Sequence, residues 1–178
     1  MYFLGISSVP RDQGDPLRTV KKQTYINDQS AVEGFVNEAT GSSWMAVDTE
    51  FERVRTFYPK LCLIQIAIPR QSVCIDPLVD LDLTSMCRLF EDPGILKIFH
   101  SARQDLEVLQ HSQGISLTNI FDTQVAAALT GYGDQIGYGH LVNEVCDVQL
   151  SKAFTRTPWG RRPLTDDEIL YAIHDVEY

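Results

Sequence analysis

The stretch Trp44–Phe51, W-M-A-V-D-T-E-F, decides the fold. It is short, mostly apolar and rich in strand-forming residues, so it predicts a buried strand. Two more apolar runs follow it, Leu61–Ile68 (LCLIQIAI) and Ser72–Ile75. The turn residues Pro69, Arg70 and Gln71 separate these two runs, so a hairpin is expected there.

Strand and helix patterns alternate on both sides of this segment. We expect a short strand at Gln23–Ile26 and a fourth core strand at Leu96–Phe99 (LKIF). A helix over 31–39 is expected after a cap at Asp28 or Ser30, and a last helix after the T-x-x-E capping box that opens at Thr165. Further helices are predicted at 83–90, 102–111, 122–129 and 141–146. The sequence therefore predicts an α/β protein with a mixed sheet of five to six strands flanked by helices.

Length and composition indicate a single globular domain. The chain has 178 residues, of which 44% are hydrophobic and 22% are charged. Pro10, Gly14 and Pro16 interrupt any periodicity near the start, so residues 1–22 are expected to be a loose extension and 23–178 the domain. No apolar run approaches the ~20 residues of a membrane span. No secretory signal pattern opens the chain, so a cytoplasmic protein without membrane contact is expected.

The charge balance restricts how the protein can bind nucleic acid. The net charge is -9, with 24 acidic and 15 basic residues. Binding that relies on lysine and arginine neutralising many phosphates is disfavoured. An enzyme that holds a nucleic-acid end through bound cations remains compatible, because its acidic site contributes to the negative charge.

Two carboxylates occupy one apolar strand. Asp48 and Glu50 are two residues apart, so they project from the same face of the strand at 44–51. Two like charges are costly to bury together unless a cation compensates them. The alternative is a strand end at which both side chains reach solvent.

Three more residues complete an acidic constellation. Asp105 follows the strand at 96–99 near a helix start, and Tyr171 and Asp175 share one face of the last helix. Each has an ordinary explanation alone, as a first-turn aspartate or a polar helix edge. Together with Asp48 and Glu50, the aspartates offer the oxygen ligands that Mg²⁺ and Mn²⁺ prefer. Two such ions can activate water and stabilise a leaving 3′-oxygen, with the Tyr171 hydroxyl orienting the water.

The chain resembles the ribonuclease D family of DEDD exonucleases, in the subclass with a tyrosine in the third motif. The similar segments extend over about residues 24–178. They are V-D-T-E-F (47–51), R-x-R-T-x-Y-P (53–59), LCLIQIA with Gln65, H-S-A-R-Q-D-L-E-V-L (100–109), Asp122-Thr123-Gln124, the run 156–164, and Tyr171-Ala172-Ile173-His174-Asp175.

This resemblance implies a ribonuclease-H-like exonuclease fold and two-metal hydrolysis of RNA from its 3′ end, with nucleoside 5′-monophosphates as products. Asp48, Glu50, Asp105 and Asp175 would bind two Mg²⁺ or Mn²⁺ ions, and Tyr171 would position water. Ribonuclease D also carries helical C-terminal domains that this chain, ending at Tyr178, lacks, so only the catalytic domain is expected. The alternatives are a DNA 3′→5′ exonuclease, a short-oligonucleotide nuclease, and a catalytically silent nucleic-acid-binding domain.

Supporting residues have both structural and substrate-binding explanations. Phe51, Gln65 and His100 are candidates for contact with the terminal nucleotide or for structural roles. Asp122 is expected to cap a helix or support the site without binding metal. Two basic groups flank the site and are candidates for phosphate contacts, with solvated loops as the alternative. They are Arg53, Arg55 and Lys60 after the first motif, and Lys152, Arg156, Arg161 and Arg162 before the last helix.

Overall fold

Six strands form one mixed sheet in the computed structural model, which describes residues 22–53 and 57–178. The strands lie in the order β1-β4-β3-β2-β5-β6. Strand β3 runs antiparallel to both of its neighbours, and the other adjacent pairs are parallel. Their bounds are β1 Lys22–Ile26, β2 Trp44–Glu52, β3 Lys60–Ile68, β4 Gln71–Ile75, β5 Leu96–Phe99 and β6 Ile120–Asp122.

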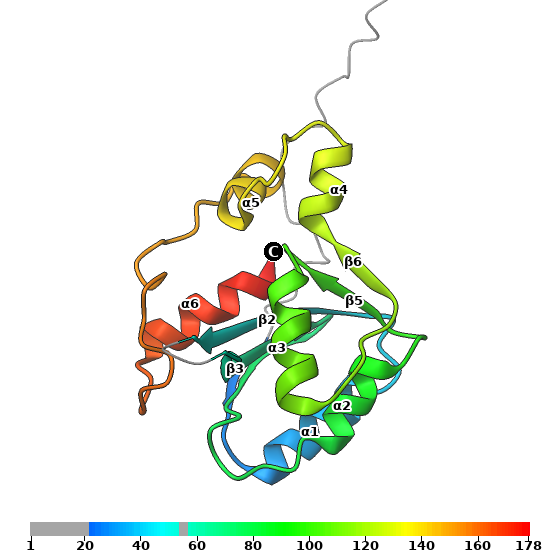
Figure 1. Cartoon of the computed structure of the whole chain (residues 1–178), viewed down its shortest axis with the longest axis vertical. Coiled ribbons are helices and arrows are strands. Elements are labelled where there is room, and N and C mark those ends of the chain that lie inside the picture. The colour runs from blue at the N-terminus through cyan, green and yellow to red at the C-terminus, as the bar shows by residue number, and fades with distance from the viewer. Residues whose placement is uncertain (1–21, 54–56) are drawn as a thin grey trace, which may run out of the picture.

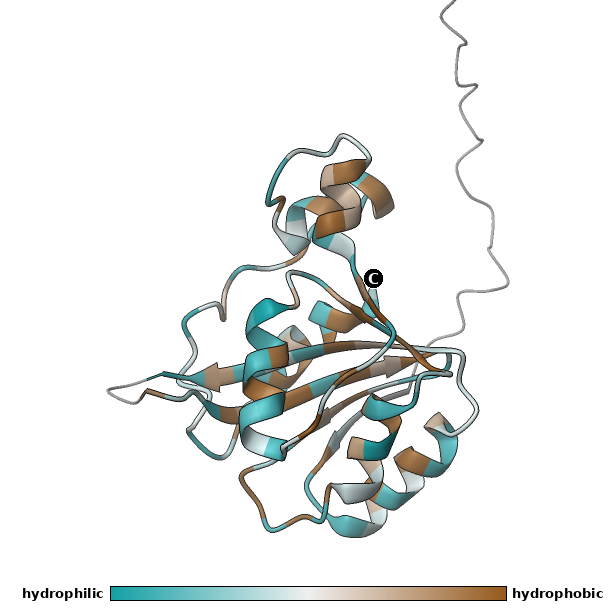
Figure 2. Cartoon of the chain, turned by 45° about the vertical axis from the view of Figure 1, so that its right-hand side comes forward, coloured by the Kyte–Doolittle hydropathy of each residue, from teal (hydrophilic) through white to brown (hydrophobic). Residues whose placement is uncertain are grey.

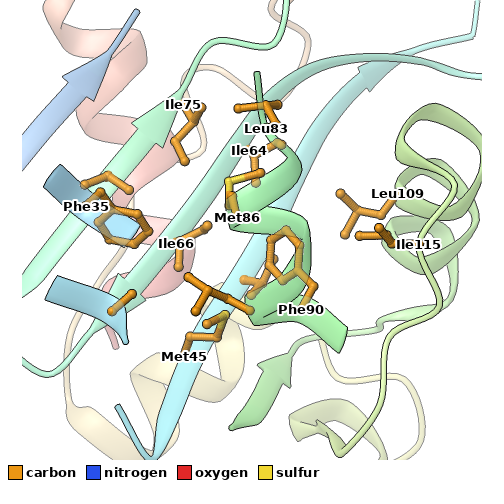
Figure 3. Packing of buried hydrophobic residues seen from close by; sticks show 14 of the residues in the cluster. Phe35, Met45, Ile64, Ile66, Ile75, Leu83, Met86, Phe90, Leu109 and Ile115 are labelled. Carbon is orange, nitrogen blue, oxygen red and sulfur yellow. The ribbon is translucent and has the colours of Figure 1, made fainter. Parts of the chain in front are cut away.

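Strand β3 lies in the middle of the sheet, and layers of helix cover both of its faces. Every residue from Leu61 to Ile68 is buried. This burial on both faces explains why the segment reads as a continuous apolar run instead of alternating. Figure 3 shows Ile64 and Ile66 of β3 packed with Met45, Met86 and Phe90 on one face of the sheet.

The helices form one layer on each face of the sheet. α1, α2 and α3 pack on the face that carries the larger core, and α6 packs on the opposite face (Figure 1). In Figure 2 the strands are mostly hydrophobic, whereas the helices are hydrophobic on one side only. α4 and α5 lie outside these layers, at the top of Figure 1. The helices are α1 Gln29–Ala39, α2 Thr84–Glu91, α3 Arg103–Gln113, α4 Thr123–Leu129, α5 Tyr138–Cys146 and α6 Asp166–Glu177.

A bulge in the β2–β3 pair changes which side chains face each layer. Glu50 pairs with Leu63, but the next residue, Phe51, pairs with Leu61, so Cys62 is the extra residue. Both Cys62 and Leu63 therefore contribute to the core under α6, while Leu61 packs in the core under α1–α3. The bulge lies beside Glu50, at the edge of the acidic cluster.

The predicted α/β class and mixed sheet are confirmed, with corrections at element boundaries. Asp28, and not Ser30, caps α1, and Gln71 belongs to β4 instead of the turn. α5 begins three residues before the predicted start at Leu141. β6 was not predicted, because three residues carry no measurable period and two of them are exposed. Of the predicted extension 1–22, residues 1–21 lie outside the described residues.

The capping box at the last helix is confirmed. The Thr165 hydroxyl accepts from the Glu168 amide, and the Glu168 carboxylate accepts from the Thr165 amide. The capping box therefore defines the start of the helix that carries Tyr171 and Asp175. Within the described residues, no helix has the length and apolar character that crossing a bilayer requires.

Candidate active site

Three carboxylates meet between strand β2 and helix α6. The alternation of β2 places Asp48 and Glu50 on the face that α6 covers, and α6 brings Asp175 onto them. One carboxylate oxygen from each of the three residues lies within 4.8 Å of the other two. The predicted proximity of residues from the first and third motifs is therefore present in the structure.

The raised pKa values of these carboxyl groups indicate that the cluster either holds protons or binds a cation. Burial, then the charges of Asp105, Asp175 and Glu50, raises the pKa of Asp48 well above its ordinary value. Burial, followed by Asp175 and Asp105, raises the pKa of Glu50 to about 8, and burial raises the pKa of Asp175 to about 7. At neutral pH the ionised cluster thus needs a compensating positive charge. Its oxygen-only donor set fits a hard divalent cation.

Asp105 lies beside this cluster but does not join its closest group. It is buried in the first turn of α3, on the other face of β2, and accepts a 2.5 Å hydrogen bond from the Thr49 hydroxyl. Burial raises its pKa to about 6, against the opposing effect of the Thr49 hydrogen bond. Its charge is close enough to raise the pKa values of both Asp48 and Glu50. Asp105 therefore acts on the cluster through its charge, while its carboxylate is not one of the three that meet there.

Tyr171 is held between two aromatic side chains at the mouth of a cavity. Its ring stacks on Trp159, with centroids 6.3 Å apart, and meets the edge of Phe154 at 5.8 Å. Burial raises the pKa of Tyr171, so its hydroxyl stays protonated at neutral pH. Tyr171 and Asp175 both line a cavity of about 620 Å³ between α5 and the segment before α6, together with Tyr138, His140, Asn143, Gln149 and Lys152.

Two of the predicted nucleotide contacts lie on the central strands. Gln65 pairs with Asp48 across β2–β3 and is fully buried, and neither side-chain polar atom has a hydrogen-bond partner among the described residues. An unpaired buried amide is costly, which favours a functional reason for this residue. Phe51 is partly buried and packs against the core under α1–α3. Its position favours the packing role over base stacking.

The ring nitrogens of His100 already have protein partners. Nδ1 lies 2.9 Å from the Thr123 hydroxyl oxygen, and Nε2 lies 2.9 Å from the Ile136 carbonyl oxygen. Burial lowers the pKa of His100, so the neutral ring is favoured. These contacts favour the structural role, in which His100 connects the end of β5 to the segment before α5.

The predicted basic groups divide into structural and free side chains. Arg53 pairs with Glu107 on α3 at 2.8 Å, and Arg55 lies outside the described residues. Arg161 and Arg162 are engaged by Glu168 and Asp76. Lys152 is exposed and lines the cavity beside Tyr171, and Arg156 is also exposed. Lys152 is therefore the best-placed phosphate contact of the set.

Asp122 has the capping role that was expected of it. It caps α4 and also accepts from the backbone amides of Ser101 and Ala102 at the start of α3. Burial opposes ionisation, but four backbone amides together lower the pKa of Asp122. It therefore joins two helix starts and does not bind in the cluster.

Several residues around the site had no signal in local periodicity, although Trp159 lies in the run 156–164 that resembles ribonuclease D. Thr49 projects from the face of β2 opposite to Asp48, so the alternation of the strand predicts no role for Thr49 in the site. The hydrogen bond from Thr49 to Asp105 depends on where α3 packs. Trp159 and Phe154 precede Tyr171 by 12 and 17 residues in an irregular segment. No periodicity links such residues before the fold is known.

The fold and the acidic cluster together define the class of ribonuclease-H-like exonucleases. A family model described as a 3′-5′ exonuclease matches residues 23–178, and the chain belongs to this family. Its sequence is 44% identical over 145 residues to ribonuclease D of Jannaschia sp. (strain CCS1), an alignment covering 79% of this chain and 38% of that protein. The resemblance to ribonuclease D that the motifs indicated is thus confirmed.

Solved structures show the same relationship. Escherichia coli RNase D, described as an exoribonuclease involved in structured RNA processing, matches with a TM-score of 0.84 at 35% identity, covering 87% of this chain and 41% of that one. The catalytic core of RRP6 from Trypanosoma brucei matches with a TM-score of 0.80 at 28% identity, covering 88% and 44%. The chain spans about two fifths of the length of the curated relatives it matches.

Proposed function

We propose that residues 23–178 form the catalytic domain of an exoribonuclease that removes nucleotides from the 3′ end of RNA. The products are nucleoside 5′-monophosphates, and two divalent ions, Mg²⁺ or Mn²⁺, are the cofactors. The close approach of Asp48, Glu50 and Asp175 carries this proposal, because three half-buried like charges side by side need cations. Ribonuclease D relatives at 44% and 40% identity support RNA as the substrate. A cytoplasmic location is part of the same proposal.

Four carboxylates would hold the two ions: those of Asp48, Glu50, Asp105 and Asp175. The charges of the other three acids all raise the pKa of Asp48, so Asp48 lies close to each of them. When bound, two divalent ions lower the pKa of an attacking water and stabilise the leaving 3′-oxygen.

Tyr171 orients the attacking water in this assignment. Its hydroxyl stays protonated, so it can donate to or accept from a water near the scissile phosphate. Asp175 is one helical turn further along α6, on the same face. The same helix therefore places the water and one ligand of the cluster relative to each other.

The cavity between α5 and the segment before α6 would hold the 3′-terminal nucleotides. Lys152 would contact a phosphate there, and the neighbouring Arg156 would extend that contact. Gln65 lies beside Asp48 and would bind the terminal ribose or base once substrate binding exposes its buried amide. Phe51 and His100 would support the site by packing. Arg53, which also pairs with Glu107, would contact upstream phosphates, and the same role is proposed for Arg55 from its place in the sequence.

Hydrolysis of end-labelled strands tests the proposal. A 5′-labelled RNA should shorten one nucleotide at a time in Mg²⁺ or Mn²⁺, and a chelator should stop the reaction. Degradation of DNA and RNA at equal rates would contradict the assigned substrate, and cleavage restricted to dinucleotides would indicate a short-oligonucleotide nuclease. Binding of RNA without hydrolysis in either metal would indicate a silent binding domain instead.

A further inference from the structure

The side chain of Arg162 is saturated with protein acceptors, which is unusual for a residue in an irregular segment. Its Nε and Nη2 donate to the two carboxylate oxygens of Asp76, at 2.6 and 2.7 Å. Nη1 donates to the carbonyls of Trp159 and Arg161, and Nη2 also donates to the carbonyl of Cys62. These bonds use all five N–H groups of the guanidinium.

Asp76 is equally well satisfied and anchors this arginine to the sheet. It follows β4 directly, has a side chain 1% exposed, and also accepts from the Tyr25 hydroxyl and the Leu78 amide. Buried, bidentate pairs of this kind are geometrically specific. Although burial opposes ionisation, the bonds from Arg162 and Tyr25 lower the pKa of Asp76, so the pair is ionic at neutral pH.

The acceptors of Arg162 define a fixed position for Trp159. The carbonyl of Trp159 binds Arg162 directly, and the next residue, Gly160, donates its amide to the Glu52 carboxylate at 2.8 Å. A Cβ on Gly160 would lie 2.5 Å from a Glu52 carboxylate oxygen, so the backbone approaches this side chain as closely as glycine permits. The two contacts tie the turn at 159–160 to the ends of β2 and β4.

The ring of Trp159 packs against the ring of Tyr171. The indole is 4% exposed, and it stacks on the Tyr171 ring with an interplanar angle of 27°. Figure 1 shows how the segment between α5 and α6 wraps around the start of α6, where it can hold this helix from outside. A contact path thus leads from the Asp76–Arg162 pair through Trp159 to Tyr171.

We propose that Arg162, held by Asp76, is a positioning residue for the Tyr171 hydroxyl and acts through the ring of Trp159. This rests on the role proposed for Tyr171 in hydrolysis. All five N–H groups of Arg162 are bonded within the protein, so none is left to bind RNA. Replacing Arg162 should therefore lower kcat and leave KM nearly unchanged. This distinguishes it from the phosphate-contact role that its place in a basic run indicates.

Arg162→Lys tests the proposal, because lysine keeps the charge but cannot make five planar bonds. We expect kcat to fall about tenfold with KM within about twofold, since small misplacements of a reacting group have effects of this size. Arg88→Lys, the same change at an exposed position on α2, is the matched control and should leave both constants unchanged.

A double-mutant cycle separates positioning from general structural support. In a Tyr171→Phe background the hydroxyl is absent, so Arg162→Lys should lower kcat by less than about twofold. An equal loss in both backgrounds would contradict the positioning role and leave the proposed function intact. Absence of RNA hydrolysis by the wild-type protein would contradict the proposed function, whereas full activity of Tyr171→Phe would overturn the role of Tyr171 and with it this proposal.

A second pair of variants covers the case in which Arg162→Lys does not fold. Trp159→Phe retains an aromatic surface and should keep most of kcat, whereas Trp159→Leu should lower kcat about tenfold. Thermal melting should show both variants folded at the assay temperature. Equal kcat values for Trp159→Phe, Trp159→Leu and the wild type would overturn the proposal.

Discussion

The Thr49 hydroxyl donates a hydrogen bond to the Asp105 carboxylate from the face of β2 opposite to Asp48. Both partners are buried, so the bond is not exchanged with solvent. Strand β2 therefore carries Asp48 and Glu50 on one face, and on the other face its Thr49 hydroxyl binds the carboxylate of Asp105. The bond opposes the rise in the pKa of Asp105 that burial causes.

Replacing Thr49 with valine should weaken the site without unfolding the protein. Valine has nearly the same shape but cannot donate, so the pKa of Asp105 should rise further. We expect metal affinity or activity to fall roughly tenfold, as for other groups that orient metal ligands. Titration of activity with Mg²⁺ measures this effect. Thr24→Val is the control, because the Thr24 hydroxyl has no partner in the described residues; a similar loss there would contradict the explanation.

Asp175→Asn should abolish hydrolysis and stabilise the metal-free protein. A ligand to catalytic ions is worth several kcal/mol of transition-state stabilisation, so a loss of about a thousandfold is expected. Removing one of three half-buried like charges should raise the melting temperature in chelator. Added Mg²⁺ should raise the melting temperature of the wild type more than that of the variant. Glu38→Gln, on the exposed side of α1, should change neither property.

The stability of the metal-free protein should fall as pH rises from about 5 to 8. The folded-state pKa values of Glu50 and Asp175, about 8 and about 7, lie above their ordinary values. The folded protein therefore holds protons that the unfolded chain releases, and this stabilisation is lost as pH rises through those pKa values. Urea unfolding in chelator at several pH values tests the sign. A Glu50→Gln/Asp175→Asn variant should show a smaller slope, and an unchanged slope would refute the assignment.

Asp122→Ala should destabilise the protein more than loss of an ordinary cap does. Asp122 satisfies amides at the starts of both α3 and α4, whereas Asp28 accepts one amide bond at the start of α1. We expect a loss of about 2 kcal/mol for Asp122→Ala and about 1 kcal/mol for Asp28→Ala. Because α3 carries Asp105, activity should also fall in Asp122→Ala only. Chemical denaturation and RNA hydrolysis measure the two effects.

Gln65→Leu should stabilise the fold and weaken substrate binding. Its amide is buried without a protein partner, so leucine should stabilise the fold by about 1 kcal/mol. If Gln65 contacts the terminal nucleotide, KM should rise several-fold in the same variant. Ser72→Ala also removes a buried unpaired group but lies away from Asp48, so it should leave KM unchanged. An unchanged KM in Gln65→Leu would assign the residue to the sheet alone.

Local patterns in the sequence were sufficient for the class of fold and for the acids on β2. A side chain two residues along a strand returns to the same face, so the pairing of Asp48 with Glu50 needs no tertiary information. The capping box at Thr165 likewise defines the start of α6 and, by helical spacing, the shared face of Tyr171 and Asp175. The three-residue strand β6 was missed, because it forms only by pairing with β5.

Tertiary structure alone decided which groups act on the site. The bulge at Cys62, the bond from Thr49 to Asp105 and the saturation of Arg162 by Asp76, Cys62 and Trp159 join residues far apart in the chain. Sequence placed Arg162 in a basic run suited to phosphate contacts, but the structure directs its guanidinium inward. The reason is physical: the partner of a charge depends on which groups the packed core brings within reach, and no local period encodes that distance.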